Sequence, residues 1–253
     1  MLKIEKVYKY FGGVKAVDGL SFEISSEKIT GLIGPNGAGK STVFNLITGF
    51  SRVDEGSIKF ENKEISQFST EKTVKMGLIR TFQLPGELKN MSVLDNLLVS
   101  PMHHPGESLL FGWINRRKSN KFEQKNIVDA KKNLEIVGLT HLIKEKAGNL
   151  STGQKKLLEL ARILMMNPKL ILLDEPAAGI NPTLINSLSK VILDINKKQR
   201  IDFVIIEHNM DFIMSLSDEI IVMAEGKTLF KGTPEEVRKN DKVLNSYLGY
   251  SEK

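Results

Sequence analysis

A glycine-rich segment that directly follows an apolar run constrains the fold of this chain more than any other feature of its sequence. Residues 34–42 read GPNGAGKST and fit the pattern G-x-x-x-x-G-K-[ST], and residues 30–33 before them are typical of a buried strand. In this context the backbone N–H groups of the loop point at phosphate oxygens, and a helix that begins near Lys40 adds its positive end. A glycine-rich turn that binds nothing is the alternative, but it does not account for the position between strand and helix. The segment predicts a phosphate-binding loop.

The residues of this loop are candidates for binding a phosphate ligand. We expect Lys40 to reach the β and γ phosphates of a nucleotide and the Ser41 hydroxyl to hold Mg²⁺. The candidate nucleotide-binding residues here are Gly34, Pro35, Asn36, Gly37, Ala38, Gly39, Lys40, Ser41 and Thr42.

Two adjacent carboxylates follow a second apolar run, Leu170 to Leu173. Open α/β sheets bind their ligands at the carboxyl ends of their strands, where Asp174 and Glu175 are expected to lie. Asp174 is placed to hold magnesium through a water molecule, and Glu175 to orient or deprotonate an attacking water. Considered alone, the pair could equally be a solvated turn at the end of a strand.

A third apolar run, Phe203 to Ile206, ends in Glu207 and His208. A single histidine at a strand end is by default a surface residue. At this edge of the sheet, however, its N–H group is a donor for a γ phosphate or for the attacking water. We therefore place His208 with Glu175 and Lys40 among the candidate catalytic residues.

The segment LSTGQ at residues 150–154 precedes a helix with an apolar stripe. Ser151 as N-cap and Gln154 three residues later form a capping box, which would start this helix without any ligand. The same free N–H groups can equally receive a phosphate. The residues alone leave both interpretations open.

The apolar pattern indicates an α/β fold. Residues 2–4 and 22–24 alternate as half-buried strands do, and residues 58–60 add another extended piece, so the N-terminal region is expected to be partly antiparallel. The three unalternating runs are typical of parallel strands that are covered on both faces. Helical patterns lie between these runs, at residues 127–137, 154–165 and 184–195.

A helical subdomain is expected between the halves of the sheet-bearing part. Residues 84–166 carry no strand pattern, so we predict that they form a helical subdomain inserted in a core of residues 1–83 and 167–253. Its first half is expected to be a long loop or short insertion, which includes His103–His104 and the basic run Arg116–Lys118.

The composition excludes several classes of protein. With 41% apolar residues the chain is too apolar to be disordered, and without cysteine it has neither a disulfide framework nor a cysteine-based zinc site. No run approaches the ~18 consecutive apolar residues of a membrane-spanning helix, and the N-terminus shows no signal peptide, so we expect a cytosolic protein. The net charge of +6 points only weakly to nucleic acid, anionic membrane surfaces or phosphate ligands.

Five motifs in this order resemble the ATP-binding subunit of ABC transporters. They are GPNGAGKST at 34–42, Gln83 within RTFQ, LSTGQ at 150–154, LILLDEP at 170–176 and His208. The resemblance covers nearly the whole chain. It implies an α/β fold of the P-loop NTPase class, in which an ABC cassette has a mixed sheet core, an N-terminal antiparallel β part and an inserted helical subdomain. Residues 1–253 would then form a single ABC ATP-binding domain.

The chain resembles most the LivG-type subunits of branched-chain amino acid importers. The segments that carry this likeness are FGG at 11–13, RTFQ at 80–83, residues 91–99, PAAGINP at 176–182, IEHNM at 206–210 and residues 232–249. The resemblance implies an ATPase in which ATP binding closes a cassette dimer and hydrolysis resets it, which drives the transmembrane subunits. The implied cofactors are ATP and Mg²⁺, and the implied location is the cytoplasmic face of the cell membrane, as a peripheral protein.

The resemblance also implies roles for residues outside the phosphate loop. In a head-to-tail dimer, Ser151, Gly153 and Gln154 of the LSTGQ segment would face ATP bound to the partner cassette, with Ser151 and Gly153 at its γ phosphate. Gln83 would sense the magnesium, as a ligand beside Ser41 and Asp174, and signal to the membrane subunits. His208 would contact the γ phosphate, and Phe11, or less well Tyr10, would stack on adenine unless Phe11 is a core aromatic.

The implied partners are a second cassette and transmembrane permease subunits, with a solute-binding protein acting indirectly and no nucleic acid expected. The family favours a related LivF-type chain as the second cassette over a second copy of this chain. Two residues depart from the family pattern. Thr152 replaces the first glycine of LSGGQ, and Asn181 stands where many cassettes have Asp, although LivG-type chains often have Asn there.

Other functions fit the sequence less well. A soluble ABC ATPase that acts on nucleic acid or ribosomes usually has two cassettes or a long coiled coil, and this chain has one phosphate loop and no heptad tract. A P-loop kinase for a small metabolite leaves LSTGQ and His208 unexplained. Importers of urea, amides or short peptides use similar subunits and stay open as alternatives, because this subunit does not touch the transported substrate.

Overall fold

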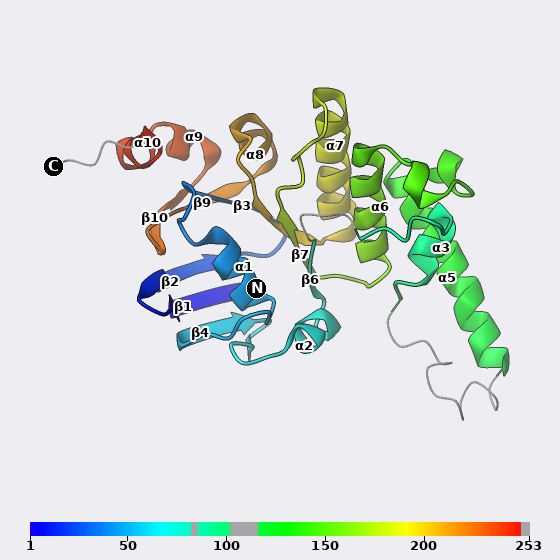
Figure 1. Cartoon of the computed structure of the whole chain (residues 1–253), viewed down its shortest axis with the longest axis horizontal. Coiled ribbons are helices and arrows are strands. Elements are labelled where there is room, and N and C mark those ends of the chain that lie inside the picture. Colours follow the sequence, from blue (N-terminus) through cyan, green and yellow to red (C-terminus); the bar gives the residue numbers. More distant parts are fainter. Residues whose placement is uncertain (82–85, 102–115, 249–253) are drawn as a thin grey trace. The chain divides into compact units, whose positions relative to one another are not determined.

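A computed structural model describes residues 1–81, 86–101 and 116–248 of the chain (Figure 1). The chain divides into two compact units, of which the first comprises Met1–Gln83, Lys169–Ala178 and Ile195–Lys253. The second comprises Leu84–Pro168 and Gly179–Asp194. It thus includes the region expected as a helical subdomain and also residues 179–194, which the sequence pattern did not assign to it.

A mixed six-stranded sheet in the order β10-β9-β3-β8-β7-β6 organises the first unit. Strand β3 runs parallel to its neighbours β8 and β9, β7 runs parallel to β8 and β6, and β10 pairs antiparallel with β9. Every residue of β3, β7 and β8 is buried, as expected of strands that are covered on both faces. The strands are β3 (Ile29–Ile33), β6 (Leu78–Arg80), β7 (Leu170–Asp174), β8 (Asp202–Ile206), β9 (Glu219–Ala224) and β10 (Lys227–Gly232).

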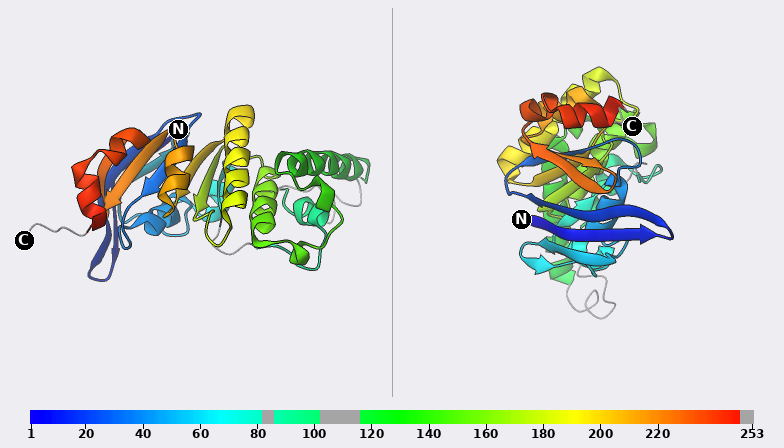
Figure 2. Two further views of the ribbon diagram at one scale, coloured as in Figure 1. Left: turned by 90° about the horizontal axis from the view of Figure 1, so that it is seen from above. Right: turned by 90° about the vertical axis from the view of Figure 1, so that its left-hand side faces the viewer.

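A second sheet of the first unit is antiparallel, with the order β2-β1-β4-β5. It confirms the predicted antiparallel N-terminal region, and Figure 2 shows its long hairpin of β1 and β2 in dark blue. Helix α1 (Lys40–Ile47) buries Val43 and Phe44 in a core that contains residues of both sheets. The strands of this sheet are β1 (Leu2–Phe11), β2 (Val14–Ile24), β4 (Glu55–Phe60) and β5 (Lys63–Glu64).

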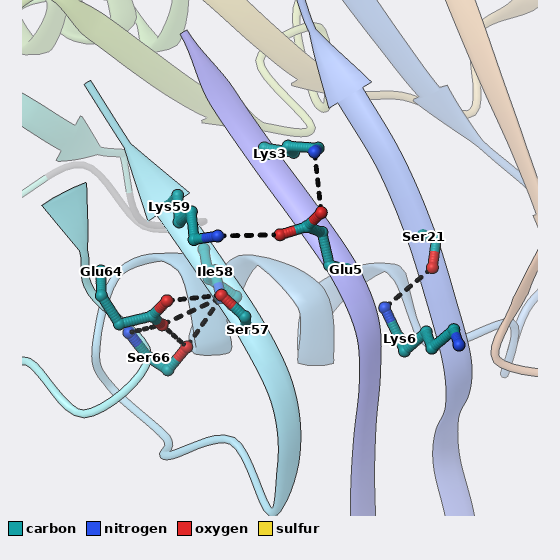
Figure 3. A network of polar contacts seen from close by, with 9 residues as sticks. All are labelled: Lys3, Glu5, Lys6, Ser21, Ser57, Ile58, Lys59, Glu64 and Ser66. Atoms are coloured by element: carbon teal, nitrogen blue, oxygen red, sulfur yellow. Dashed lines mark hydrogen bonds and ion pairs between the residues drawn. The ribbon is translucent and has the colours of Figure 1, made fainter. Parts of the chain in front are cut away.

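A polar network connects the strands of the antiparallel sheet (Figure 3). Glu5 on β1 pairs with Lys3, with a distance of 2.7 Å between Nζ and Oε1, and with Lys59 on β4, at 3.1 Å from its Oε2. Farther along, Glu64 accepts hydrogen bonds from the hydroxyls of Ser57 and Ser66. Burial alone would raise the pKa of the Glu64 carboxyl, but these hydrogen bonds outweigh it and hold the pKa below its usual value.

Helices make up the second unit. Leu97 on α3, Leu134 on α5 and Leu158 on α6 are buried, and these three helices contact one another. Within residues 86–101 and 116–168 the structure has no strand, as the sequence predicted. These ranges contain only an isolated β-bridge, between Ser92 and Lys146. The unit contains α3 (Val93–Leu98), α5 (Arg116–Ile136), 3₁₀ turns at Thr140–Leu142 and Ala147–Asn149, α6 (Thr152–Leu164) and the first part of α7 (Pro182–Gln199).

The structure corrects one sequence expectation and adds elements. Helix α5 begins at Arg116, so the expectation that the basic run Arg116–Lys118 is a loop was wrong. The first turns of α5 contain a single large apolar residue, Phe122, and therefore show no helical periodicity. The sequence pattern also did not predict β6, β9 or β10, nor the helices α2 (Thr70–Lys75), α8 (Met210–Leu216), α9 (Pro234–Arg238) and α10 (Asp241–Leu248).

No helix within the described residues is long and apolar enough to cross a membrane. His103 and His104 lie outside the described residues.

Candidate functional site

Four neighbouring strands bring the predicted functional residues to one edge of the mixed sheet. The order β3-β8-β7-β6 and its parallel pairing place the carboxyl ends of all four strands together. The glycine-rich loop follows β3, and His208 follows β8. Asp174 and Glu175 lie at the end of β7, and Arg80 ends β6. Residues far apart in the chain thereby meet where ligands of open α/β sheets bind.

The loop after β3 requires glycine at two close approaches. Gly34 and Gly39 have φ angles of 155° and 95°. A Cβ atom at Gly34 would lie 2.2 Å from the carbonyl oxygen of Met223, and one at Gly39 would lie 2.3 Å from that of Ala16. Helix α1 begins directly after Gly39, and no side chain of the described residues caps it. Its first N–H groups are therefore not engaged by a capping side chain, which is the arrangement that anion binding at a helix N-terminus uses.

The amine of Lys40 is folded back onto this loop. Its Nζ donates hydrogen bonds to the carbonyl oxygens of Gly34, at 2.8 Å, and of Pro35, at 3.0 Å, and the residue is 6% exposed. Burial lowers the pKa of Lys40, and the charges of Glu175 and Asp174 oppose that shift without cancelling it. The amine is thus held at the loop by carbonyl groups that a phosphate could replace.

Asp174 forms a buried ion pair that sequence analysis did not find. Its Oδ2 lies 2.6 Å from Nη2 of Arg80, and Nη1 of Arg80 donates to Oδ1 of Asn45 at 2.6 Å. The side chain of Asp174 is 2% exposed, and its Oδ1 has no hydrogen-bond partner among the described residues. A buried carboxylate oxygen without a hydrogen-bond partner suits Mg²⁺, which prefers hard oxygen ligands.

Glu175 and His208 face each other across β7 and β8. Nε2 of His208 lies 3.2 Å from Oε1 of Glu175, and both side chains are partly exposed. Glu175 has a φ of 51°, a left-handed conformation that non-glycine residues adopt rarely, and its N–H donates to the carbonyl oxygen of Ile206 at 2.9 Å. Backbone strain of this kind is found at functional sites, where the surrounding structure holds it.

A buried carboxylate next to His208 also belongs to this edge. Glu207 is 5% exposed and accepts hydrogen bonds from the backbone N–H groups of Ala177, His208 and Asn209. The sequence placed Glu207 at a strand end but gave it no role. A charged residue directly after an all-apolar strand was the available signal.

The LSTGQ segment lies in the second unit, at the start of α6. Ser151 and Gln154 form the predicted capping box, in which the N–H of Gln154 donates to Oγ of Ser151 at 3.3 Å and the N–H of Ser151 to Oε1 of Gln154 at 2.9 Å. Within this unit, a Cβ atom at Gly153 would lie 2.4 Å from Cδ1 of Leu184 on α7. Gly153 therefore also allows a close approach between α6 and α7.

The remaining predicted residues have different outcomes. Phe11 is 52% exposed at the end of β1, so it is not a core aromatic, and Lys9 Nζ lies 5.5 Å from its ring centroid. Tyr10 stacks against Tyr8 instead, with 6.2 Å between ring centroids. Gln83 lies outside the described residues.

The two departures from the family pattern lie at helix starts of the second unit. Thr152 is the first residue of α6. Asn181 accepts a hydrogen bond from the N–H of Leu184 at 2.9 Å and so caps α7. An aspartate could form the same cap, so this contact gives no structural reason for the exchange.

Comparisons with known proteins agree with this geometry. A family model described as ABC transporter matches residues 17–178. A probable branched-chain amino acid transport ATP-binding protein LivG of Methanocaldococcus jannaschii is 43% identical over 253 residues, which cover 98% of this chain and 97% of that protein. The high-affinity branched-chain amino acid transport ATP-binding protein BraF of Pseudomonas aeruginosa is 37% identical over 249 residues, 98% of each chain.

Solved structures give the same result for the fold. The ADP conformation of an ATP-binding cassette of an ABC transporter superposes with a TM-score of 0.84, at 40% identity and over 98% of both chains. A nucleotide-free cassette from an ABC transporter superposes with a TM-score of 0.82, again at 40% identity and over 98% of both chains.

Proposed function

The chain belongs to the ABC transporter family of ATP-binding cassettes, and on this premise we propose that it is the ATP-hydrolysing subunit of an importer for branched-chain amino acids. The relatives named for branched-chain amino acid transport support this substrate, because they resemble the chain over nearly its whole length. One observation carries the ATPase assignment. Lys40, the pair of Asp174 and Glu175, and His208 follow three neighbouring parallel strands and reach the same edge of the sheet.

At this edge each residue has a defined part in phosphoryl transfer. The N–H groups of residues 34–42 surround the phosphates of ATP, and Lys40 exchanges its loop carbonyls for the β and γ phosphate oxygens. Glu175 orients the attacking water and accepts its proton. Before ATP binds, His208 donates a hydrogen bond to Glu175 and holds it in place. Once ATP is bound, His208 donates to the γ phosphate instead. Positioning and charge stabilisation of this kind provide most of the catalysis in phosphoryl transfer.

Magnesium fits the same edge. We propose Ser41 and Asp174 as its ligands, with Gln83 as the third, and the free Oδ1 of Asp174 supports this assignment. When bound, Mg²⁺ neutralises charge that develops on the phosphates. Phe11, exposed at the end of the first strand, is available to stack on adenine.

The proposed active form has a second cassette. Ser151, Gly153 and Gln154 would serve the nucleotide of that partner, which is a related LivF-type chain or a second copy. The whole chain would act as one ATP-binding domain, with a nucleotide-binding core and a signature-bearing helical part, peripheral to the membrane on its cytoplasmic face. ATP can drive the transmembrane subunits only by binding the closed dimer more tightly than the open one, and hydrolysis removes that preference.

Reconstitution tests this proposal. The chain, a LivF-type cassette, the permease subunits and a solute-binding protein in vesicles should take up labelled leucine when ATP and Mg²⁺ are supplied on the cassette side. Lys40→Ala should abolish uptake and hydrolysis, and Glu175→Gln should abolish both while ATP still binds. Lys75→Gln, which changes an exposed residue of α2, is the matched control and should behave as wild type. Uptake that survives Glu175→Gln would contradict the coupling, and ATPase activity stimulated by nucleic acid instead of the assembly would contradict the transport role.

A further inference from the structure

We propose that Glu207 is a positioning residue that sets the spacing of Glu175 and His208, an inference that rests on the function proposed above. Oε1 of Glu207 accepts a hydrogen bond from the N–H of Ala177 at 2.7 Å. Its Oε2 accepts from the N–H of His208 at 2.8 Å and from the N–H of Asn209 at 3.1 Å. One carboxylate therefore joins the segment that follows β7 to the segment that follows β8.

The bridge begins where the strand ladder ends. The pairing of β7 with β8 runs from Leu170 opposite Asp202 to Asp174 opposite Ile206. Beyond it, the N–H of Glu175 still donates to the carbonyl oxygen of Ile206 at 2.9 Å. Glu207 provides the next connection between the two segments, through its side chain instead of the backbone.

Both halves of this connection lie close to the proposed reacting groups. Ala177 is two residues after Glu175, in a turn where the N–H of Ala178 donates to the carbonyl oxygen of Glu175 at 3.1 Å. On the other side, Glu207 holds the N–H of His208 itself. The two side chains that the bridge connects, Glu175 and His208, are 3.2 Å apart, and a displacement of about 1 Å between reacting groups can reduce a rate by about 100-fold.

The chemistry of the bridge requires a long side chain with two acceptor oxygens. A buried carboxylate is tolerated only when hydrogen bonds compensate its lost hydration, and three backbone N–H groups do so here. In Glu207→Gln, one of the two oxygens becomes an NH₂ group that faces N–H donors, so one half of the bridge is lost. In Glu207→Asp, the shorter carboxylate can still accept from the N–H two residues on, as an Asx turn does, but it no longer reaches Ala177.

The chain contains a matched control on the same strand. Asp202, at the opposite end of β8, is also a buried carboxylate, 3% exposed, and its Oδ1 accepts from the N–H of Lys28 at 2.9 Å. Asp202→Asn therefore disturbs a buried carboxylate of the same strand away from the edge that carries Glu175. A merely structural role for Glu207 would make its variants resemble Asp202→Asn.

The experiment measures kcat and KM for ATP of the assembled transporter, together with ATP binding, for the wild type, Glu207→Gln, Glu207→Asp and Asp202→Asn. We expect both Glu207 variants to lose about 10-fold to 100-fold in kcat with KM and ATP binding within about twofold of wild type, because the phosphate loop is intact. Asp202→Asn should keep the wild-type kcat. The double variant Glu207→Gln/His208→Ala should lose less than the product of the two single losses, because part of the effect of Glu207 passes through His208.

Each outcome decides between the alternatives. Wild-type turnover in Glu207→Asp, an equal loss in Asp202→Asn, or a loss that is confined to KM would overturn the positioning role. If neither Glu207 variant folds, Glu207 is a stability residue and the inference is wrong. A wild-type assembly that binds ATP without hydrolysing it would instead refute the proposed function, and the inference with it.

Discussion

Nε2 of His208 lies 3.2 Å from Oε1 of Glu175, so the side chains that follow two neighbouring parallel strands are within hydrogen-bond reach of each other. In the proposed hydrolysis, the carboxylate of Glu175 accepts the proton of the attacking water. The imidazole of His208 donates a hydrogen bond to Glu175 before ATP binds and to the γ phosphate afterwards. Glu175→Gln and His208→Ala should each lower kcat by about 100-fold or more, because each removes a positioned proton-transfer group or its partner. Single-turnover measurements with the assembled protein check this. Loss of ATP binding in Glu175→Gln would contradict the assignment.

The ion pair between Arg80 and Asp174 predicts a linkage between stability and magnesium. Arg80→Met should lower the free energy of unfolding by about 3–5 kcal/mol, because it leaves the buried carboxylate of Asp174 without its cation. ATP with Mg²⁺ should stabilise this variant more than the wild type, since the metal replaces the missing positive charge. Urea unfolding with and without Mg²⁺-ATP measures both effects. Lys75→Gln, which removes an exposed ion pair with Glu71, is the control and should leave stability unchanged.

The lowered pKa of Lys40 predicts a pH dependence of ATP binding. Burial is the main cause of the shift in the free protein, and bound phosphates favour the charged amine, so the pKa is higher in the complex than in the free protein. ATP affinity should therefore be greatest below the lowered pKa and fall as the pH rises through it. Titration with a fluorescent ATP analogue between about pH 7 and about pH 10 measures this. In Lys40→Arg, whose guanidinium stays charged, the dependence should disappear, and its persistence would assign it to another group.

The capping box of Ser151 and Gln154 separates a structural role from a functional one. Ser151→Ala should lower the free energy of unfolding by about 1 kcal/mol, because the N–H of Gln154 loses its acceptor. If Ser151 also serves the partner's ATP, the variant should in addition lose most turnover in the assembled transporter. The chain offers a matched control in its other capping box, where Thr233 caps α9. Thr233→Ala should lower the free energy of unfolding by a similar amount and keep wild-type turnover. If Ser151→Ala and Thr233→Ala have equal turnover, Ser151 has only the structural role of capping α6.

The exposed ring of Phe11 predicts a modest contribution to affinity. Phe11→Leu should weaken ATP binding by up to about tenfold, because an aliphatic side chain cannot stack on adenine, and Phe11→Tyr should restore it. Phe50, which is 69% exposed, provides the control, and Phe50→Leu should bind ATP as the wild type does. Calorimetry measures the ATP affinities. If Phe11→Leu binds ATP as tightly as the wild type does, Phe11 does not stack on adenine.

The sequence predicted those parts of this protein whose conformation depends on near neighbours. The turn of residues 34–42 uses its own glycines at positive φ angles, and the cap of α6 forms between Ser151 and Gln154. The apolar runs of β3, β7 and β8 are continuous because both faces of these strands are buried. The first turns of α5 show the limit of this reasoning, since a helical segment without an apolar stripe leaves no periodic signal.

The tertiary structure alone decided which of these residues meet. Arg80 and Asp174 are 94 positions apart and Ala177 and Glu207 are 30 apart, so no local pattern could pair them. They meet because the sheet order β3-β8-β7-β6 differs from the order of these strands in the chain and aligns their carboxyl ends. A motif therefore specifies the chemistry that a residue can perform. The strand order determines which charged residue pairs with that residue and how far it lies from the groups with which it reacts.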